Sequence, residues 1–305
     1  MINSSLNTEN IQIYSFYRFI KIKNKKKTKL LLNRFLKNKI IKGTILIADE
    51  GINASISGTK DSLNDAIIHI KDVLNIRKIN LKINDLNYIP FNKFKIRLKK
   101  EIVSLGINHL HVSSNSKNYV HPKEWDKFIS KRKVKIIDTR NTYEIKIGKF
   151  NRAINPNTKT FREFPLKIQN LDIKKNDTIA MYCTGGIRCE KASTLLKLKG
   201  FKNIHLLEGG IINYLENKKN NNSKTLWKGE CFVFDKRVTV NKKLSQGKYL
   251  QCYGCRMPIT KKDTQSSKYK KGVSCHHCYD LRSPTQKKNS EVRQKQIEMK
   301  KLNKT

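Results

Sequence analysis

The sequence of 305 residues lacks any apolar run that approaches the ~20 residues of a membrane-spanning helix. Its first ten residues are polar and contain neither the basic region nor the apolar core of a secretion signal. No internal repeat is found either. These absences argue against a membrane protein, a secreted protein and a repeat protein. They predict a soluble, cytoplasmic chain with no membrane partner.

Acidic residues are scarce. The chain has 24 Asp and Glu against 65 Lys and Arg, a formal net charge of +41. Such an excess predicts a polyanionic partner, and nucleic acid is favoured over membrane because no amphipathic anchor or lipidation motif is present. The alternative is compositional drift, because Lys, Asn and Ile are abundant even in stretches that are expected to fold.

The cysteine pattern does not suit a disulfide framework. There are seven cysteines, an odd number, and four of them form two C-x2-C pairs that are nineteen residues apart. In a reducing compartment such pairs predict a tetrahedral structural zinc site, which would fold a small polar segment. The alternatives are four incidental thiols, or a ligand supplied by His276 or His277. The predicted ligands are Cys252, Cys255, Cys275 and Cys278.

One loop carries the clearest chemical signal, because an apolar strand at 178–181 leads into it and an amphipathic helix at 191–199 follows. Backbone N–H groups of such a loop can surround the sulfur of Cys183, and the helix adds its positive N-terminal end. Two glycines permit left-handed dihedrals, and Arg188 lowers the pKa of the thiol. Cys183 is therefore predicted to be an activated nucleophile, with a buried structural cysteine as the alternative. The loop consists of Cys183, Thr184, Gly185, Gly186, Ile187 and Arg188.

Hydrophobic periodicity predicts an N-terminal domain over residues 1–112. The expected order of elements is βαββαβ, which is the signature of a ferredoxin-like or acylphosphatase-like α+β domain. The strands are expected at 11–17, 43–48, 54–57 and 80–83, and the helices at 25–39 and 60–76.

A basic stretch at 91–107 alternates Phe and Ile with Lys and Arg, so that its cations project from one face. It is interpreted either as a strand that faces phosphates or as a solvated edge strand whose lysines deter aggregation. The projecting residues are Lys93, Lys95, Arg97, Lys99 and Lys100.

Alternating β and α units predict a second domain over residues 120–219, an α/β domain with a parallel sheet. Its strand at 134–137 ends in Asp138, Thr139 and Arg140, and Glu144 follows. Ion pairing among these charged residues at the sheet edge is favoured over direct catalysis. Polar linkers are expected at 113–118 and 217–224, and a small Cys-rich module with a basic tail at 225–305. Residues 291–305 are either a charged helix or a disordered arm.

The loop length supports a family assignment. Four residues separate Cys183 from Arg188, and this resembles rhodanese domains, whereas the related phosphatases have one residue more. The wider set of motifs resembles the bacterial rhodanese-domain tRNA uridine hydroxylases. These motifs are KGTILIADEGIN at 42–53, residues 137–156, YCTGGIRCEK at 182–191, GECFVFD at 229–235 and GVSCHHCYD at 272–280.

The resemblance implies an enzyme that converts the wobble uridine in the tRNA anticodon loop to 5-hydroxyuridine with molecular oxygen. The essential cysteine of that family falls on Cys183, and Cys189 is assigned a supporting or capping role in preference to that of a resolving thiol. No P-loop, dinucleotide fingerprint or 2-His-1-carboxylate set is present, so the reductant stays unidentified. A sulfurtransferase with a Cys183 persulfide and a noncatalytic RNA-binding protein are the alternatives. A chain without residues 1–110 is expected to bind tRNA more weakly and to lose hydroxylation, but to keep any thiosulfate reaction at Cys183 largely intact.

Overall fold

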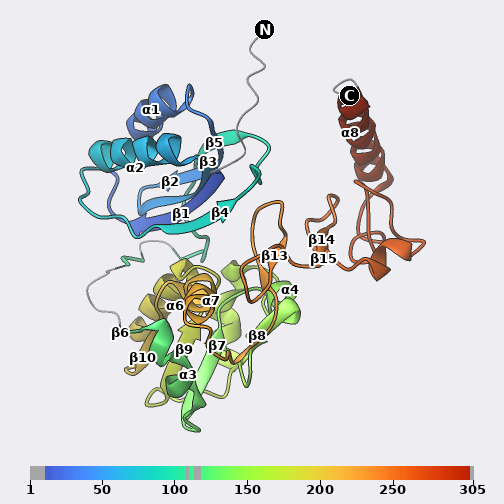
Figure 1. Cartoon of the computed structure of the whole chain (residues 1–305). Helices are drawn as coiled ribbons and strands as arrows, with labels where there is room; N and C mark the ends of the chain where they lie inside the picture. Colours follow the sequence, from blue (N-terminus) through green and yellow to red (C-terminus); the bar gives the residue numbers. More distant parts are fainter. Residues whose placement is uncertain (1–10, 108–109, 113–117, 303–305) are drawn as a thin grey trace. The chain divides into compact units, whose positions relative to one another are not determined.

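The computed structural model describes residues 11–107, 110–112 and 118–302, and its chain forms two compact units (Figure 1). The first unit comprises the described residues up to Thr142 together with Phe150–Leu226, and the second comprises Tyr143–Lys149 and the described residues from Trp227 onward. The predicted polar N-terminus and most of the predicted linker at 113–118 lie outside the described residues. Across the described ranges, no helix combines the length and the apolar character that crossing a membrane requires.

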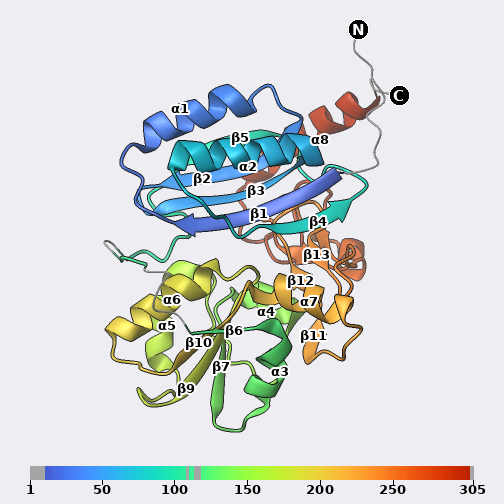
Figure 2. The same cartoon turned by 60° about the vertical axis from the view of Figure 1, so that its left-hand side comes forward.

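The first sheet confirms the predicted ferredoxin-like domain. Its strand order is β4-β1-β3-β2-β5, with β5 parallel to β2 and the other neighbours antiparallel. Both helices cover the same face of this sheet (Figure 2). The elements are β1 (Ile11–Phe19), α1 (Lys25–Leu36), β2 (Ile41–Ala48), β3 (Gly51–Thr59), α2 (Lys60–Leu74), β4 (Lys82–Leu86) and β5 (Phe94–Leu98).

Local capping chemistry decides where the two helices begin. The side chain of Asn24 accepts a hydrogen bond from the N–H of Lys27 at 2.9 Å, which starts α1. Thr59 caps α2 in the same way by accepting from the N–H of Ser62, so this helix begins at Lys60, the predicted first residue. The apolar faces of the helices and the inward side chains of the strands form one core cluster beneath them.

The basic stretch at 91–107 forms a shorter strand than predicted. Only Phe94–Leu98 is β-structure, and this strand, β5, lies at the edge of the sheet. The five cationic side chains that were expected to project together are all exposed. Exposed lysines on an edge strand block pairing with other chains, and they are equally free to meet phosphates.

The second sheet confirms the predicted parallel α/β domain. Its order is β6-β10-β9-β7, and every neighbouring pair is parallel. Helices α5 and α6 lie on one side of this sheet, and α3 and α7 on the other (Figure 2). The elements are β6 (Asn118–Val120), α3 (Pro122–Ser130), β7 (Val134–Asp138), α5 (Phe164–Lys167), β9 (Thr178–Tyr182), α6 (Ile187–Leu198), β10 (Ile204–Leu207) and α7 (Gly210–Asn220).

Two boundaries of this domain differ from the predictions. The strand β6 has only three residues, too few for a periodic signal, and it was missed. Helix α7 continues to Asn220 through the first part of the predicted linker at 217–224, because its polar final turn is exposed and needs no apolar residues.

The second unit is built from short elements. Its strand β8 pairs with β11, which explains why residues 143–149 join this unit although they lie inside the predicted 120–219 range. The predicted terminal arm is helical as far as Leu302. The elements are α4 (Thr142–Ile147), β8 (Gly148–Phe150), β11 (Trp227–Gly229), β12 (Cys231–Phe232), β13 (Thr239–Val240), β14 (Leu250–Gln251), β15 (Pro258–Ile259) and α8 (Pro284–Leu302).

Candidate functional site

The loop between β9 and α6 places Cys183 directly after the strand and close to the first turn of the helix. The N–H of Gly186 donates a hydrogen bond to the Cys183 Sγ at 3.0 Å. Gly186 has φ 101°, a left-handed conformation that favours glycine, whereas Gly185 does not share it and the prediction for that residue was wrong. Helix α6 begins at Ile187, so Ile187 and Arg188 belong to its first turn and not to the loop.

The surroundings of Cys183 favour its thiolate. The residue is 1% exposed, and burial alone opposes ionisation. A hydrogen bond from the Cys189 thiol, the positive charge of Arg188 and the N–H groups of Cys189 and Gly186 outweigh that effect, so the pKa of Cys183 lies well below its usual range. The strand end, the glycine loop and the helix start therefore favour the thiolate form of Cys183.

Cys189 lies closer to the sulfur than its place in the sequence suggested. It was expected outside the N–H ring, yet its thiol and its N–H both interact with Cys183. Its own sulfur lies 3.3 Å from the Thr139 Oγ1. Burial and the neighbouring Cys183 raise the pKa of Cys189 well above its usual range, so this thiol keeps its proton and acts as a donor. Helical geometry explains the contact, because the first turns of α6 face back toward the end of β9.

Asp138 and Arg140 support the end of the strands. Both are 0% exposed, and the Arg140 guanidinium donates to the two Asp138 oxygens at 2.9 and 2.6 Å. Between them, Thr139 donates from its N–H and its hydroxyl to the carbonyl of Tyr182 at 3.0 and 3.1 Å. This arrangement ties β7 to the residue before Cys183. The buried Glu144 lies on α4, and its segment belongs to the second unit.

Several residues around the loop come from the N-terminal domain and were missed by the sequence reasoning. Lys82 donates to the carbonyl of Gly185, and the Tyr17 hydroxyl donates to Glu190 at 2.5 Å. Lys191 pairs with Glu50 at 2.8 Å. Glu50 and Lys191 lie in two of the sequence motifs, ADEGIN and CEK, but nothing in the spacing of the motifs says that they meet.

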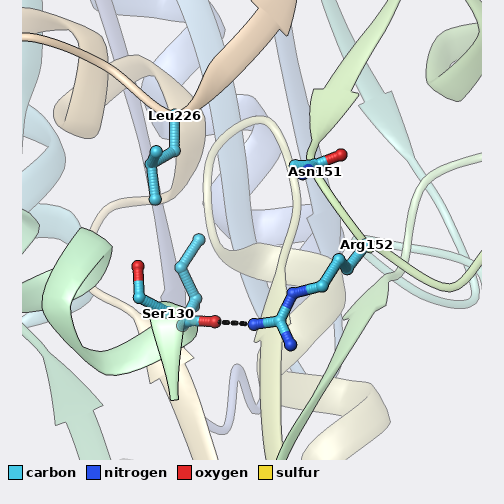
Figure 3. Close-up of a pocket in the computed structure, with 5 residues that line it drawn as sticks. Ser130, Asn151, Arg152 and Leu226 are labelled. Atoms are coloured by element: carbon cyan, nitrogen blue, oxygen red, sulfur yellow. Dashed lines mark hydrogen bonds between the residues drawn. The ribbon is translucent and has the colours of Figure 1, made fainter. Parts of the chain in front are cut away.

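A small pocket of the first unit lies apart from this loop (Figure 3). Arg152 reaches across it, and its guanidinium donates to the carbonyl of Ile129 and, at 3.5 Å, to that of Lys131. Its charge is thus engaged with backbone, and none of the predicted site residues lines the pocket. The lining residues are Ile129, Ser130, Asn151, Arg152 and Leu226.

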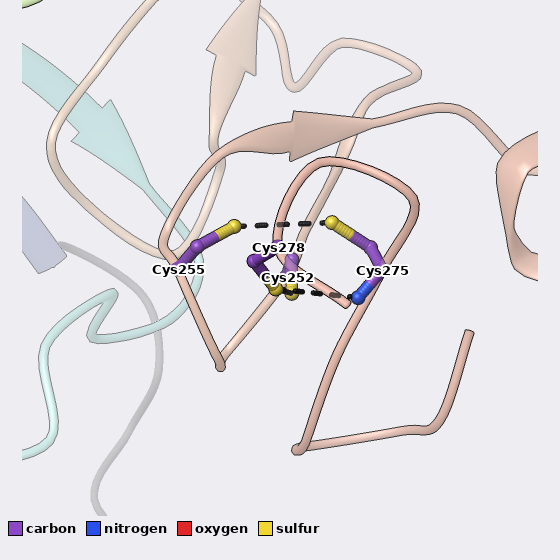
Figure 4. A group of neighbouring side chains, drawn as sticks. All are labelled: Cys252, Cys255, Cys275 and Cys278. Carbon is purple, nitrogen blue, oxygen red and sulfur yellow. Dashed lines mark hydrogen bonds between the residues drawn. The ribbon is translucent and has the colours of Figure 1, made fainter. Parts of the chain in front are cut away.

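The two C-x2-C pairs meet in the second unit (Figure 4). Their four sulfurs lie within 4.8 Å of one another, with Cys252 to Cys278 at 3.9 Å and Cys255 to Cys275 at 3.8 Å. A tetrahedral site with Zn–S bonds of about 2.3 Å has S···S edges of about 3.8 Å, whereas a disulfide needs about 2.05 Å. The donor set and its spacing therefore fit a zinc ion. His276 lies near Asp263, at 3.7 Å between Nδ1 and Oδ1, and it is not part of the sulfur cluster.

Known proteins match the chain in the same order as its domains. The profile of the UPF0176 acylphosphatase like domain matches residues 11–102, and that of the rhodanese-like domain matches residues 121–217. A tRNA uridine(34) hydroxylase of Pelagibacter ubique (strain HTCC1062) is 46% identical over 288 residues, which cover 94% of this chain and 94% of the relative.

Solved structures align with a smaller part of the chain. The rhodanese-like domain of an Anabaena sp. protein is 16% identical with a TM-score of 0.31, and the alignment covers 37% of this chain and 80% of that one. A rhodanese-related protein from Thermoplasma volcanium is 24% identical with a TM-score of 0.28, and the alignment covers 33% of this chain and 92% of that one.

Proposed function

This chain belongs to the family of the tRNA uridine(34) hydroxylases, and from that premise we propose that it hydroxylates the wobble uridine of tRNA to 5-hydroxyuridine. The relative is aligned over 94% of each chain, so the N-terminal domain and the cysteine cluster are included along with the loop. The observation that carries the proposal is the Cys183 thiol, whose pKa is held well below its usual range at the end of β9. Such a thiol is a nucleophile suited to an electron-poor ring.

The proposed chemistry begins with addition of the Cys183 thiolate to C6 of the uracil, which moves the π electrons of the C5–C6 bond toward C5. C5 then accepts an oxygen atom from molecular oxygen. The second oxygen atom leaves as water, a reduction that takes two electrons from an external reductant and protons from solvent. Loss of the C5 proton and cleavage of the C6–S bond restore the ring and free the thiolate. The protein thus acts as an oxygen-dependent oxidoreductase.

The proposed substrate accounts for the charge of the chain. The cations of the basic stretch at 93–100 are exposed, and they are free to bind the tRNA backbone while the easily unstacked wobble base reaches Cys183. Binding is then expected to weaken log-linearly with salt, with a slope of about 0.9 per duplex phosphate contacted and less on single strands. Binding that does not depend on salt would indicate that the net charge of +41 reflects compositional drift and not selection for tRNA binding. A tRNA substrate also supports a cytoplasmic location for the protein.

We propose that the sulfur cluster binds one structural zinc ion, with Cys252, Cys255, Cys275 and Cys278 as ligands. The bound metal supplies stability to a segment that has little apolar core of its own. These residues hold no substrate, so their contribution to the reaction is to keep the second unit folded.

One alternative activity has a specific observation in its favour. The four-residue spacing between Cys183 and Arg188 and the match to the rhodanese-like domain both suit transfer of sulfane sulfur through a Cys183 persulfide. A noncatalytic RNA-binding role has no such support, because binding alone does not need an ionised thiol.

Nucleoside mass spectrometry of tRNA separates these activities. Cells that lack the endogenous hydroxylase receive either this chain or its Cys183→Ser variant. The proposal expects 5-hydroxyuridine at position 34 only with the unaltered chain. A thiolated nucleoside in its place would favour sulfur transfer, and an unmodified uridine with both chains would contradict catalysis on this base.

A further inference from the structure

Residues of the N-terminal domain reach the polypeptide that holds Cys183. We infer that Tyr17, on β1, is a positioning residue of the Cys183 site and acts through Glu190, the residue after Cys189. The inference rests on the proposed role of Cys183 as the nucleophile and adds a contribution from a domain that the sequence presented only as an RNA platform.

The hydroxyl of Tyr17 has a defined partner. It donates to the Glu190 Oε1 at 2.5 Å, and the Tyr119 hydroxyl donates to the same oxygen at 3.0 Å. Glu190 is only 7% exposed, so these hydroxyls take the place of solvent around its carboxylate. Burial and the adjacent carboxylate raise the pKa of Tyr17 well above its usual range, which keeps the phenol protonated as a donor.

Tyr17 also fits against the loop itself. A Cβ atom placed on Gly186 would lie 2.9 Å from the Tyr17 hydroxyl oxygen, so the loop is shaped to accept this side chain. Gly186 is the residue whose N–H donates to the Cys183 Sγ. One residue earlier, Lys82 of β4 donates to the carbonyl of Gly185. Two side chains of the N-terminal domain thus lie on the peptides that surround the sulfur.

A buried ion pair fixes these contacts in place. Lys191, on α6, is 0% exposed, and its ammonium pairs with Glu50 at 2.8 Å and with Glu101, while also donating to the Val103 carbonyl at 3.0 Å. Burial opposes ionisation of Glu101, but Lys191 and the N–H groups of Leu105 and Gly106 hold its pKa below the usual value. A buried ammonium is strongly destabilising unless carboxylates pair with it. The pairs of Lys191 with Glu50 and Glu101 therefore hold α6 against the N-terminal domain.

The contact gives Tyr17 a way to influence the thiol. Tyr17 interacts electrostatically with both Glu190 and Cys183, so it is a neighbour of the carboxylate and of the thiol. A carboxylate in the neighbourhood of a thiolate disfavours the thiolate, and donors that compensate the carboxylate weaken this effect. Removal of the Tyr17 hydroxyl leaves Glu190 with less compensation, which raises the pKa of Cys183 and lowers its reactivity at a pH below that pKa. The charged and titratable groups around the site are Arg188, Cys189 and Glu190 of α6, Tyr17 of β1, Lys82 of β4, Tyr119 of β6 and Glu208, which follows β10.

The test measures alkylation of Cys183 by iodoacetamide as a function of pH in the full chain, read on the Cys183 peptide by mass spectrometry. Tyr17→Phe is compared with Tyr14→Phe, because Tyr14 lies on the same strand but donates to Asn64 at 2.8 Å, away from the loop. We expect the pH of half-maximal alkylation to rise by about half a unit in Tyr17→Phe, so that alkylation at a pH below the pKa falls about threefold. Tyr14→Phe is expected to match the unaltered chain.

A second comparison shows whether the effect passes through Glu190. In a Glu190→Gln background, Tyr17→Phe is expected to leave the pKa of Cys183 unchanged, because the carboxylate charge that the Tyr17 hydroxyl compensates is absent. Superimposable profiles of Tyr17→Phe and the unaltered chain would overturn the inference, as would an equal shift in Tyr14→Phe or a shift that persists in Glu190→Gln. A shift without any tRNA hydroxylation by the unaltered chain would refute the proposed function and leave the inference standing.

Discussion

Two groups of cysteines in this chain have the same side chain and opposite roles. Cys183 and Cys189 lie in a large apolar cluster, where N–H donors and Arg188 stabilise one thiolate. The four cysteines of the second unit are themselves most of their local core, with Ile259 as their fully buried apolar neighbour. Around Cys183 the apolar cluster stabilises the fold, so the thiol does not have to contribute to stability and can take part in a reaction. Where the fold supplies little stability, the four thiols are placed to bind the proposed zinc ion, which would provide it.

The largest effect is expected from Cys183→Ser. A serine hydroxyl does not ionise near neutral pH, so hydroxylation of tRNA should be lost completely while the thermal midpoint changes little. The measurement is the 5-hydroxyuridine content of tRNA together with thermal unfolding of the purified variant. Full activity in this variant would remove Cys183 from the reaction.

A change in the other group should act on structure and leave the nucleophile alone. Cys252→Ser removes one of the four ligands, so we expect bound zinc to fall from about one per chain to nearly none and the second unit to become sensitive to protease. Elemental analysis and limited proteolysis check this, with Cys231→Ser as the matched control because Cys231 is buried outside the cluster. Freshly prepared, unchelated protein without stoichiometric metal would contradict the zinc assignment, and a loss of Cys183 alkylation in Cys252→Ser would show that the two groups depend on each other.

A smaller effect is expected from Cys189→Ala, which removes a thiol donor from Cys183. A hydrogen bond to a charged group is worth about 1.5–3 kcal/mol, so the thiolate population at a pH below the new pKa should fall about tenfold or more. Because the pKa of Cys183 rises in the variant, the defect should be greatest at low pH and disappear at alkaline pH. Rates of hydroxylation across pH test this, and a defect of equal size at every pH would point to a resolving thiol.

The sequence alone predicted those features of the structure that depend on local patterns of residues. The two fold classes followed from periodicity, and the spacing of the thiols predicted the sulfur cluster that the structure brings together. The contact of Cys189 with Cys183 was missed because it depends on how the first turn of α6 is oriented. The Tyr17 to Glu190 bond joins residues 173 positions apart, and no local pattern encodes such a pairing.

One expectation changes with the structure. A chain without residues 1–110 was expected to keep a thiosulfate reaction at Cys183, but that deletion removes Glu50 and Glu101 and leaves the ammonium of Lys191 without the carboxylates that it pairs with. The buried charge would then destabilise α6. We therefore expect the truncated chain to lose Cys183 reactivity along with tRNA binding.

The stabilised thiolate of Cys183 is tested most directly by the pH dependence of its alkylation in the unaltered full chain, measured on the Cys183 peptide by mass spectrometry. We expect half-maximal reactivity at a pH well below the ordinary cysteine pKa of about 8.5, with reactivity lost as the pH falls through the lowered pKa. Half-maximal reactivity at or above about 8.5 would contradict the claim that the loop, Arg188 and Cys189 hold this thiol as a thiolate.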